Sequence, residues 1–350
     1  MKKQNKITLF LFLMLFQMSF VIDGYAQDVL TVGEVTAHPG EKASGFIRVN
    51  GDDGGIDASI PVTLIRGKRP GPVLALLAGI HGSEYAPIIA LQRLSQELDP
   101  DSMSGTVILV LTAHVQSFLM RTVYYNPVDW HNLNRMFPGD PDGTMTQRIA
   151  YAITTQVIDQ CDVLIDNHAG DTNEDLAPFI FCLETGDQKT DQSMRELAKV
   201  YGIPIVKKGT VPKGAPPKYT THTAALKGKP AITIESGKIG PVKEEDVVRV
   251  VKGSYNVMKH LGILEGEPEK TPDLKWIKKS TTVSSQYTGL FYPLVVSKEW
   301  VEKGQLLGRV TDFFGEVKQE VKAPHDGMVL YLVATPPISE GEDLVSVVSF

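Results

Sequence analysis

Residues 73–84, VLALLAGIHGSE, decide the fold that the rest of the chain follows. Positions 73–78 are all apolar, which predicts a strand buried on both faces between helical layers, as in largely parallel sheets. After Gly79, we expect His81 in the strand-to-helix loop and Glu84 in the first helical turn, where both can reach one metal ion. Taken alone, the pair is also explained by a surface histidine and a carboxylate that favours a helix N-terminus.

The same pattern recurs along the chain to about residue 265. Further apolar runs predict buried strands at 106–113, 163–165 and 231–234. Between them, apolar spacing predicts helices at 84–98, 144–158, 192–201 and 244–261, and Thr144 with Gln147 forms the pattern of a capping box. Strands that alternate with helices predict an α/β domain with a mixed, largely parallel sheet flanked by helices.

The beginning of the chain has a different character. Residues 1–26 start with lysines, continue with an apolar run over 7–22 and end in Gly24-Tyr25-Ala26. This is the pattern of a secretory signal peptide cleaved after Ala26. A retained membrane anchor is the alternative, but the run is shorter than the ~20 residues that a spanning helix needs. We therefore expect an exported protein, periplasmic or extracellular, with no stable membrane insertion after processing.

The mature chain divides into two predicted domains. We expect an α/β domain over residues 27–265, of which 27–66 form an N-terminal β segment. A linker rich in Glu, Lys and Pro follows over 266–275. Residues 276–350 show short alternating runs punctuated by glycines, without a helical period, which predicts a small all-β barrel-sandwich domain.

Composition excludes several classes of protein. The 350 residues are 42% apolar, carry a formal charge of −6 and include 2 cysteines. An acidic chain without a long basic run is not expected to bind nucleic acid. Two cysteines cannot build a disulfide scaffold, and we expect Cys161 and Cys182 to be buried and unpaired because both lie in apolar runs. The sequence gives no indication of an oligomeric state.

Two more predicted strands end in side chains that can bind metal or move protons. His168 closes the segment DVLIDNH, and Glu235 directly follows the apolar run at 231–234. Sites in open α/β sheets are built at this edge. A turn histidine is the simpler alternative for His168, whereas a carboxylate after apolar strand residues costs free energy unless it is paired, exposed in a cleft or functional. Two histidines and a glutamate can form a catalytic zinc site, with a further glutamate as general base.

A fourth segment, NLNRMFPG at 132–139, carries Arg135, and Arg121 lies upstream of it. The planar guanidinium group of arginine suits a substrate carboxylate or a developing oxyanion. A surface arginine in a loop of Pro and Gly is the alternative interpretation.

The segments GIHGSE, NLNRMFPG and PAITIESG and the His168 strand end occur in the order and spacing of a known family. Over nearly its whole mature length the chain resembles the succinylglutamate desuccinylase/aspartoacylase family, within the zinc-carboxypeptidase-like superfamily. The resemblance implies a zinc-carboxypeptidase-like fold, with the catalytic domain at 27–265. It also implies one Zn²⁺ ion per chain, bound by His81, Glu84 and His168.

The same resemblance implies roles for the other site residues. Glu235 is expected to activate the metal-bound water and to pass its proton to the leaving nitrogen. Asn134 and Arg135 are expected to hold a substrate carboxylate, and Arg121 to polarise the scissile carbonyl. The implied activity is a zinc-dependent deacylase that cleaves the amide bond of an N-acyl amino acid or a similar carboxylate-bearing substrate.

Alternatives to this function remain open at the level of sequence. Export also fits a carboxypeptidase-like hydrolase of peptides, including cell-wall peptides. A non-enzymatic binding protein could keep the same fold. Histidine and carboxylate ligands accept several metals besides zinc.

The chain departs from the family pattern at Asn132, where many relatives have aspartate. If this position orients a histidine ligand, a neutral amide should make the ligand less basic and the metal site weaker. His114 is expected to line the pocket or to cap a strand. The C-terminal region resembles a biotinyl/lipoyl-type barrel, but Lys318 lacks the flanking methionines of biotin carriers. We therefore expect a packing or access-controlling domain rather than a carrier.

Overall fold

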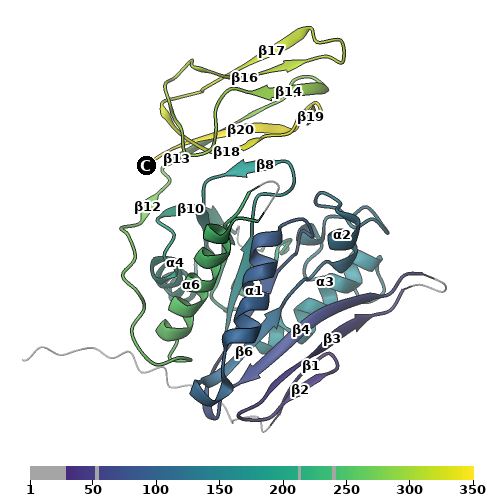
Figure 1. Cartoon of the computed structure of the whole chain (residues 1–350), viewed down its shortest axis with the longest axis vertical. Helices are drawn as coiled ribbons and strands as arrows, with labels where there is room; N and C mark the ends of the chain where they lie inside the picture. Colours follow the sequence, from purple (N-terminus) through teal and green to yellow (C-terminus); the bar gives the residue numbers. More distant parts are fainter. Residues whose placement is uncertain (1–28, 52–54, 212–213, 239–241) are drawn as a thin grey trace, which may run out of the picture.

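A computed structural model of the chain describes residues 29–51, 55–211, 214–238 and 242–350. They form a large α/β region and a smaller β region, which lie next to each other (Figure 1). The expected signal peptide, residues 1–26, lies outside the described residues. Within the described part of the chain, no helix has both the length and the apolar character needed to cross a membrane.

A mixed sheet, nine-stranded over the described residues, forms the centre of the α/β region. Its middle pairs, β5 with β6, β5 with β7 and β7 with β11, run parallel, which confirms the predicted largely parallel sheet. In spatial order the strands are β12 (Lys275–Trp276), β10 (Ile205–Thr210), β9 (Phe179–Glu184), β11 (Ala231–Glu235), β7 (Val163–His168), β5 (Arg69–Ala78), β6 (Ser104–Val110), β4 (Ala58–Arg66) and β3 (Lys42–Val49). A hairpin of β1 (Leu30–Val32) and β2 (Val35–Ala37) lies beside β3.

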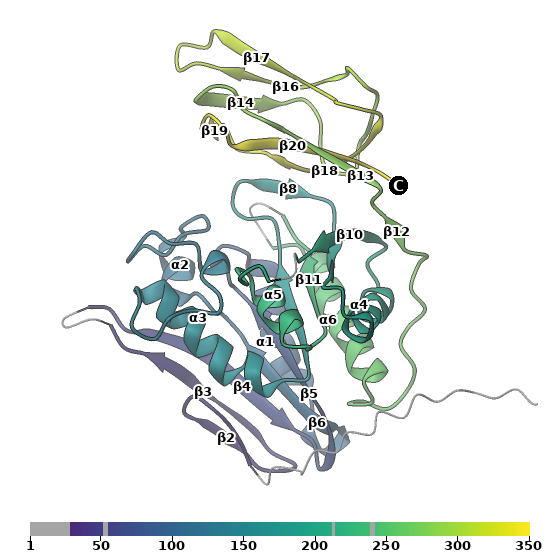
Figure 2. The same cartoon turned by 180° about the vertical axis from the view of Figure 1, so that it is seen from behind.

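Helices cover both faces of the sheet (Figure 2). One face packs against α1 (Tyr85–Glu97), α4 (Gln188–Tyr201) and α6 (Glu244–His260). The other packs against α3 (Met145–Gln156) and against α5 (Thr220–Leu226), which lies next to β7 and β11. Because apolar side chains lie on both faces, β5 and β7 have the continuous apolar pattern from which they were predicted.

The predicted helices are present, with one difference in extent. The helix predicted at 192–201 begins at Gln188, because the Asp187 side chain accepts a hydrogen bond from the Thr190 amide at 2.8 Å and caps an earlier turn. The short helices α2 (Val115–Met120) and α5 were not predicted. Both are too short to show a clear helical period.

The C-terminal region contains two antiparallel sheets around one apolar core, as its pattern of short alternating runs predicts. The first sheet is formed by β13 (Lys279–Ser284), β20 (Asp343–Ser349), β18 (Gly327–Val333) and β15 (Trp300–Val301). The second sheet is formed by β17 (Val317–Lys322), β16 (Leu306–Thr311), β14 (Gly289–Pro293) and β19 (Pro337–Ile338).

The two regions share strands. In the segment predicted as a linker and just beyond it, β12 joins the edge of the large sheet by pairing with β10. From the α/β region, β8 (Glu174–Leu176) pairs with β18 of the C-terminal region, and both views show it between the two. The loop that follows β7 is thereby fixed to the C-terminal region.

Both cysteines are buried and unpaired, as predicted. Burial raises the pKa of the Cys161 thiol to about 12, and that of Cys182 likewise. Protonated, enclosed thiols of this kind pack as small apolar side chains.

Candidate metal centre

Three neighbouring strands, β5, β7 and β11, carry the residues predicted to form the site. His168 is the last residue of β7, and Glu235, the last residue of β11, lies opposite it in the parallel register. After β5 the chain turns at Gly79, whose φ of +68° is a backbone conformation suited to glycine. A Cβ atom at Gly79 would lie 3.1 Å from the Ile88 side chain. This turn places His81 at the same edge, just before α1.

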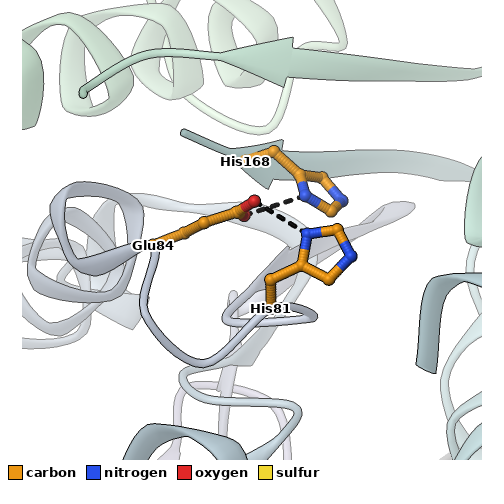
Figure 3. Close-up of side chains that lie close together, drawn as sticks. All are labelled: His81, Glu84 and His168. Carbon is orange, nitrogen blue, oxygen red and sulfur yellow. Dashed lines mark hydrogen bonds and ion pairs between the residues drawn. The ribbon is translucent and has the colours of Figure 1, made fainter. Parts of the chain in front are cut away.

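His81, Glu84 and His168 converge on one point (Figure 3). The Nδ1 atom of His81 lies 2.8 Å from one carboxylate oxygen of Glu84, and the Nδ1 atom of His168 lies 2.8 Å from the other. All three side chains are buried. Ligand atoms from these residues lie within 4.8 Å of one another, which is close enough for a single ion.

The outer nitrogen of each imidazole ring is held by a second polar side chain. His81 Nε2 lies 3.2 Å from Asn132 Oδ1, and His168 Nε2 lies 3.1 Å from Asp166 Oδ2. Asp166 is fully buried and also accepts a hydrogen bond from the Thr220 hydroxyl. Such contacts fix the orientation of a histidine ligand and raise its basicity. Asn132 therefore has the position that the sequence suggested, with a neutral group.

The charges of the cluster support one another. Burial alone would raise the pKa of Glu84, but His168 and His81 outweigh it and lower this pKa to about 2. Burial would lower the pKa of His168, whereas Asp166 and Glu84 raise it well above its usual range. A buried carboxylate between two imidazole nitrogens is the mixed nitrogen and oxygen donor set that fits Zn²⁺. The residues present thus fit a zinc ion.

Glu235 lies beside this cluster without belonging to the ligand group. Burial raises the pKa of Glu235 well above its usual range; His168 opposes this shift, and Glu84, Glu174 and Asp166 add to it. A carboxylate with a raised pKa is suited to accept a proton near neutral pH and to release it again.

Asn134 reaches the cluster, and Arg135 lies at its exposed side. The amide nitrogen of Asn134 is 3.5 Å from His168 Nε2. The Arg135 guanidinium group lies 4.7 Å from the centre of the Tyr219 ring and donates a hydrogen bond to the Asn134 carbonyl at 2.9 Å. Arg135 is exposed, so its guanidinium group is available to an anionic ligand.

Arg121 is not brought into this group. It ends α2 with a φ of +54° and is exposed. Among the described residues, no hydrogen bond or ion pair joins Arg121 to the cluster or to Glu235. Its role in polarising the scissile carbonyl stays a prediction.

Several residues near the cluster were not predicted to belong to the site. The Tyr124 ring lies edge-on to His81, with ring centres 5.4 Å apart, and its hydroxyl donates to Glu174 at 2.5 Å. Asp171 accepts a hydrogen bond from Ser83 at 2.7 Å. These residues lie in irregular loops and in a three-residue strand, where no periodic pattern marks them.

His114, which was expected to line the pocket or cap a strand, lies at the start of α2 and is fully buried. Its Nδ1 atom lies 3.2 Å from the Ile80 carbonyl oxygen. Burial, together with the nearby His81, lowers the pKa of His114 to about 4, so it is neutral at neutral pH. His114 therefore packs behind the loop that carries His81.

Comparison with known proteins adds to this geometry. The sequence profile of the succinylglutamate desuccinylase/aspartoacylase catalytic domain matches residues 70–261. The N-alpha-acetyl-L-2,4-diaminobutyric acid deacetylase of Halomonas elongata is 32% identical over 286 residues, which cover 77% of this chain and 80% of that protein. The matched residues 70–261 include every residue of the cluster.

Solved structures are similar over most of the chain. The product-bound ectoine utilization protein EutE (DoeB) from Ruegeria pomeroyi has a TM-score of 0.80 at 27% identity. The succinylglutamate desuccinylase/aspartoacylase from Rhodobacter sphaeroides has a TM-score of 0.78 at 25% identity. Each comparison covers 88% of this chain and 95% of the other.

Proposed function

The chain belongs to the succinylglutamate desuccinylase/aspartoacylase family, and from this premise we propose that it is a zinc-dependent amide hydrolase. The family consists of deacylases that act on N-acyl amino acids. The proposed reaction removes the acyl group from an N-acyl amino acid or a similar carboxylate-bearing substrate. The observation that carries the proposal is the convergence of His81, Glu84 and His168 at a sheet edge beside Glu235.

In the proposed mechanism, one group of residues binds the metal ion and Glu235 transfers the proton. His81, Glu84 and His168 would hold the ion, which when bound polarises a carbonyl group and lowers the pKa of a water molecule. Glu235 takes a proton from the attacking water as its oxygen bonds to the carbonyl carbon. The same carboxyl group then delivers that proton to the leaving nitrogen as the carbon–nitrogen bond breaks.

The substrate is held by groups on the segment that contains Asn134. Arg135 and Asn134 orient the substrate carboxylate, Arg135 by its charge and Asn134 by its amide next to His168. For Arg121, at the end of α2, the proposed role is to polarise the scissile carbonyl.

Replacing Glu235 with glutamine tests the proposed base. E235Q keeps all three proposed ligands, so it should retain a full complement of zinc in elemental analysis while turnover falls by about 10²–10⁴-fold. Glu184→Gln is a matched control, because Glu184 ends the neighbouring strand β9 and pairs with Lys208 outside the cluster. Turnover of E235Q near that of the control would remove Glu235 from the mechanism.

Replacing His168 with alanine tests the ligand set. H168A should lose metal, and unchanged zinc stoichiometry would contradict the assignment. A substrate panel of N-acyl amino acids and cell-wall peptides, assayed with the metal-loaded protein, then separates a deacylase from a peptidase. Hydrolysis of cell-wall peptides without hydrolysis of any N-acyl amino acid would show that the protein is a peptidase and not a deacylase.

We also propose that the protein is exported, on the pattern of residues 1–26. Fractionation of cells that express the full chain should place it outside the cytoplasm, with Gln27 as its first residue. Recovery of an uncleaved chain from the cytoplasm would contradict export.

A further inference from the structure

Two carboxylates that follow β7, Asp171 in the loop and Glu174 at the start of β8, form no ion pair with a lysine or arginine among the described residues. Asp171 is fully buried, and its Oδ1 atom accepts hydrogen bonds from the Ser83 hydroxyl and the Thr172 amide, each at 2.7 Å. Its Oδ2 atom has no hydrogen-bond partner within the described chain. Asp171 also lines a small hollow together with Ser83 and two lysines, Lys238 and Lys243, and the Lys238 ammonium group is paired with Asp175. A buried carboxylate oxygen left in this state is costly unless a donor reaches it.

Glu174 is the second of these carboxylates, and it lies one tyrosine side chain away from the metal centre. The Tyr124 hydroxyl donates to Glu174 at 2.5 Å, while the ring of Tyr124 packs against the imidazole of His81. Burial raises the pKa of Glu174, and the nearby carboxylates of Glu84 and Asp171 add to this rise. A positive charge beside Glu174 would lower this pKa and favour the charged carboxylate.

The next residue of β8, Asp175, is a carboxylate with a structural role, and its charge is paired. Asp175 is paired with the Lys238 ammonium group at 2.8 Å. It also accepts two hydrogen bonds from Ser297 of the C-terminal region. Glu174 and Asp171 have no such partner in the described residues, although they lie in the same short segment.

The C-terminal region holds Glu174 in place. Val333 of β18 lies opposite Glu174 in the antiparallel register, and the Ala334 amide donates to the Asn173 carbonyl at 2.8 Å. Because the backbone on both sides of Glu174 is bonded in this way, β8 is fixed against the C-terminal region (Figure 2), and Glu174 is held on this strand. Preorganised charges of this kind bind a ligand without the cost of ordering a loop.

From these observations we propose that Glu174 and Asp171 form an anionic subsite that binds an ammonium group of the substrate. The inference rests on the proposed function. Glu84 and Asp166 contact the two histidines, and His81 offsets the charges of Glu174 and Asp171 only in part, because the pKa of each carboxyl group stays raised. A substrate with a carboxylate held by Arg135 and an ammonium group at Glu174 is therefore bound at both ends, and a second carboxylate at the Glu174 end is repelled.

The ammonium group could lie on the amino acid or on the acyl part, and two substrate pairs distinguish these sources. The first pair is N-α-acetyl-L-2,4-diaminobutyrate and N-α-acetyl-L-norvaline, which differ by an ammonium in place of a methyl group. The second pair, glycyl-L-norvaline and N-propionyl-L-norvaline, makes the same exchange on the acyl side. In one pair the cationic member should have a kcat/KM about tenfold or more above its neutral partner.

Replacing Glu174 with glutamine should remove that preference. E174Q should raise the KM of the preferred cationic substrate about tenfold more than the KM of its neutral partner, whereas a change of kcat caused by the altered charge near Glu235 should be the same for both members of the pair. Glu320→Gln, an exposed carboxylate on β17, is the control for loss of one negative charge. An equal loss on both members of the pair would show that Glu174 only supports the structure, and would overturn the proposal.

The wild-type protein alone also decides the question, should E174Q fail to fold. Faster hydrolysis of the neutral member in both pairs would refute the anionic subsite while leaving the proposed hydrolase intact. Hydrolysis of none of the four substrates, or of any other N-acyl amino acid, would instead contradict the proposed function itself.

Discussion

Replacing Asn132 with aspartate should tighten metal binding about tenfold. Asn132 Oδ1 lies 3.2 Å from His81 Nε2 and accepts the Asn134 amide at 2.9 Å. Aspartate keeps both contacts and adds a negative charge. A neutral hydrogen bond contributes about 1 kcal/mol and one to a charged group about 1.5–3 kcal/mol. Because Asn132 is partly buried, we take about 2.4 kcal/mol, near the middle of that range, for the contact to the charged group. The gain of about 1.4 kcal/mol corresponds to about tenfold in Kd.

The assay is competition for zinc with a fluorescent chelator, which measures the dissociation constant of the purified protein. Asn50→Asp, at an exposed position before β4, controls for the added charge. N132D should bind zinc more tightly than both the wild-type protein and this control. Equal or weaker binding by N132D would refute the argument that the neutral amide weakens the ligand His81.

Three further predictions concern stability. Gly79→Ala should lower the free energy of unfolding in urea by about 1–2 kcal/mol or more, because it combines a positive φ with a close contact to Ile88. Gly186→Ala, at a φ of +88° with open space around it, should cost less, and equal costs would argue against crowding at Gly79. The pKa of His114 is about 4 in the folded chain, below its ordinary 6.5, so the unfolded chain binds more protons between these values. The free energy of unfolding should therefore be highest above pH 6.5 and decrease by roughly 3 kcal/mol as the pH falls toward 4. In urea titrations with chelator present, His114→Gln should make this free energy depend less on pH. An unchanged pH dependence in that variant would contradict the assignment to His114. Removal of metal by a chelator should lower the Tm of the wild-type protein but not of H168A, and added zinc should restore it, whereas equal shifts in both proteins would exclude a stabilising ion at this site.

The sequence could predict that the residues of the candidate metal centre lie close together, because His81, His168 and Glu235 each stand at or after the end of a recognisable strand. His81, His168 and Glu235 come after apolar runs, and parallel strands bring their C-terminal ends to one edge of a sheet. The order of the strands in space was not predictable in the same way. For example, β9 lies antiparallel to β11, although it follows β7 in the chain. Pairings of this kind are set by tertiary packing.

The residues around the metal centre were harder to predict because they depend on irregular or distant structure. Tyr124 has a φ of +63°, in a loop without periodicity, and reaches His81 only through the fold. Glu174 lies on a strand of three residues whose partner, β18, comes more than a hundred residues later. Asp166 was not predicted as a site residue, although it lies two residues before His168 and therefore on the same face of β7. The role of Arg121 was implied by the family resemblance, and Arg121 does not belong to the group of His81, Glu84 and His168.

The most direct test of the metal centre is anomalous X-ray diffraction at the zinc absorption edge, from crystals of the purified protein. One strong anomalous peak per chain is expected between His81 Nδ1, His168 Nδ1 and the Glu84 carboxylate, with Glu235 next to it and not bound. A peak at another site, or none at these three residues in protein that is active as a deacylase, would contradict the account.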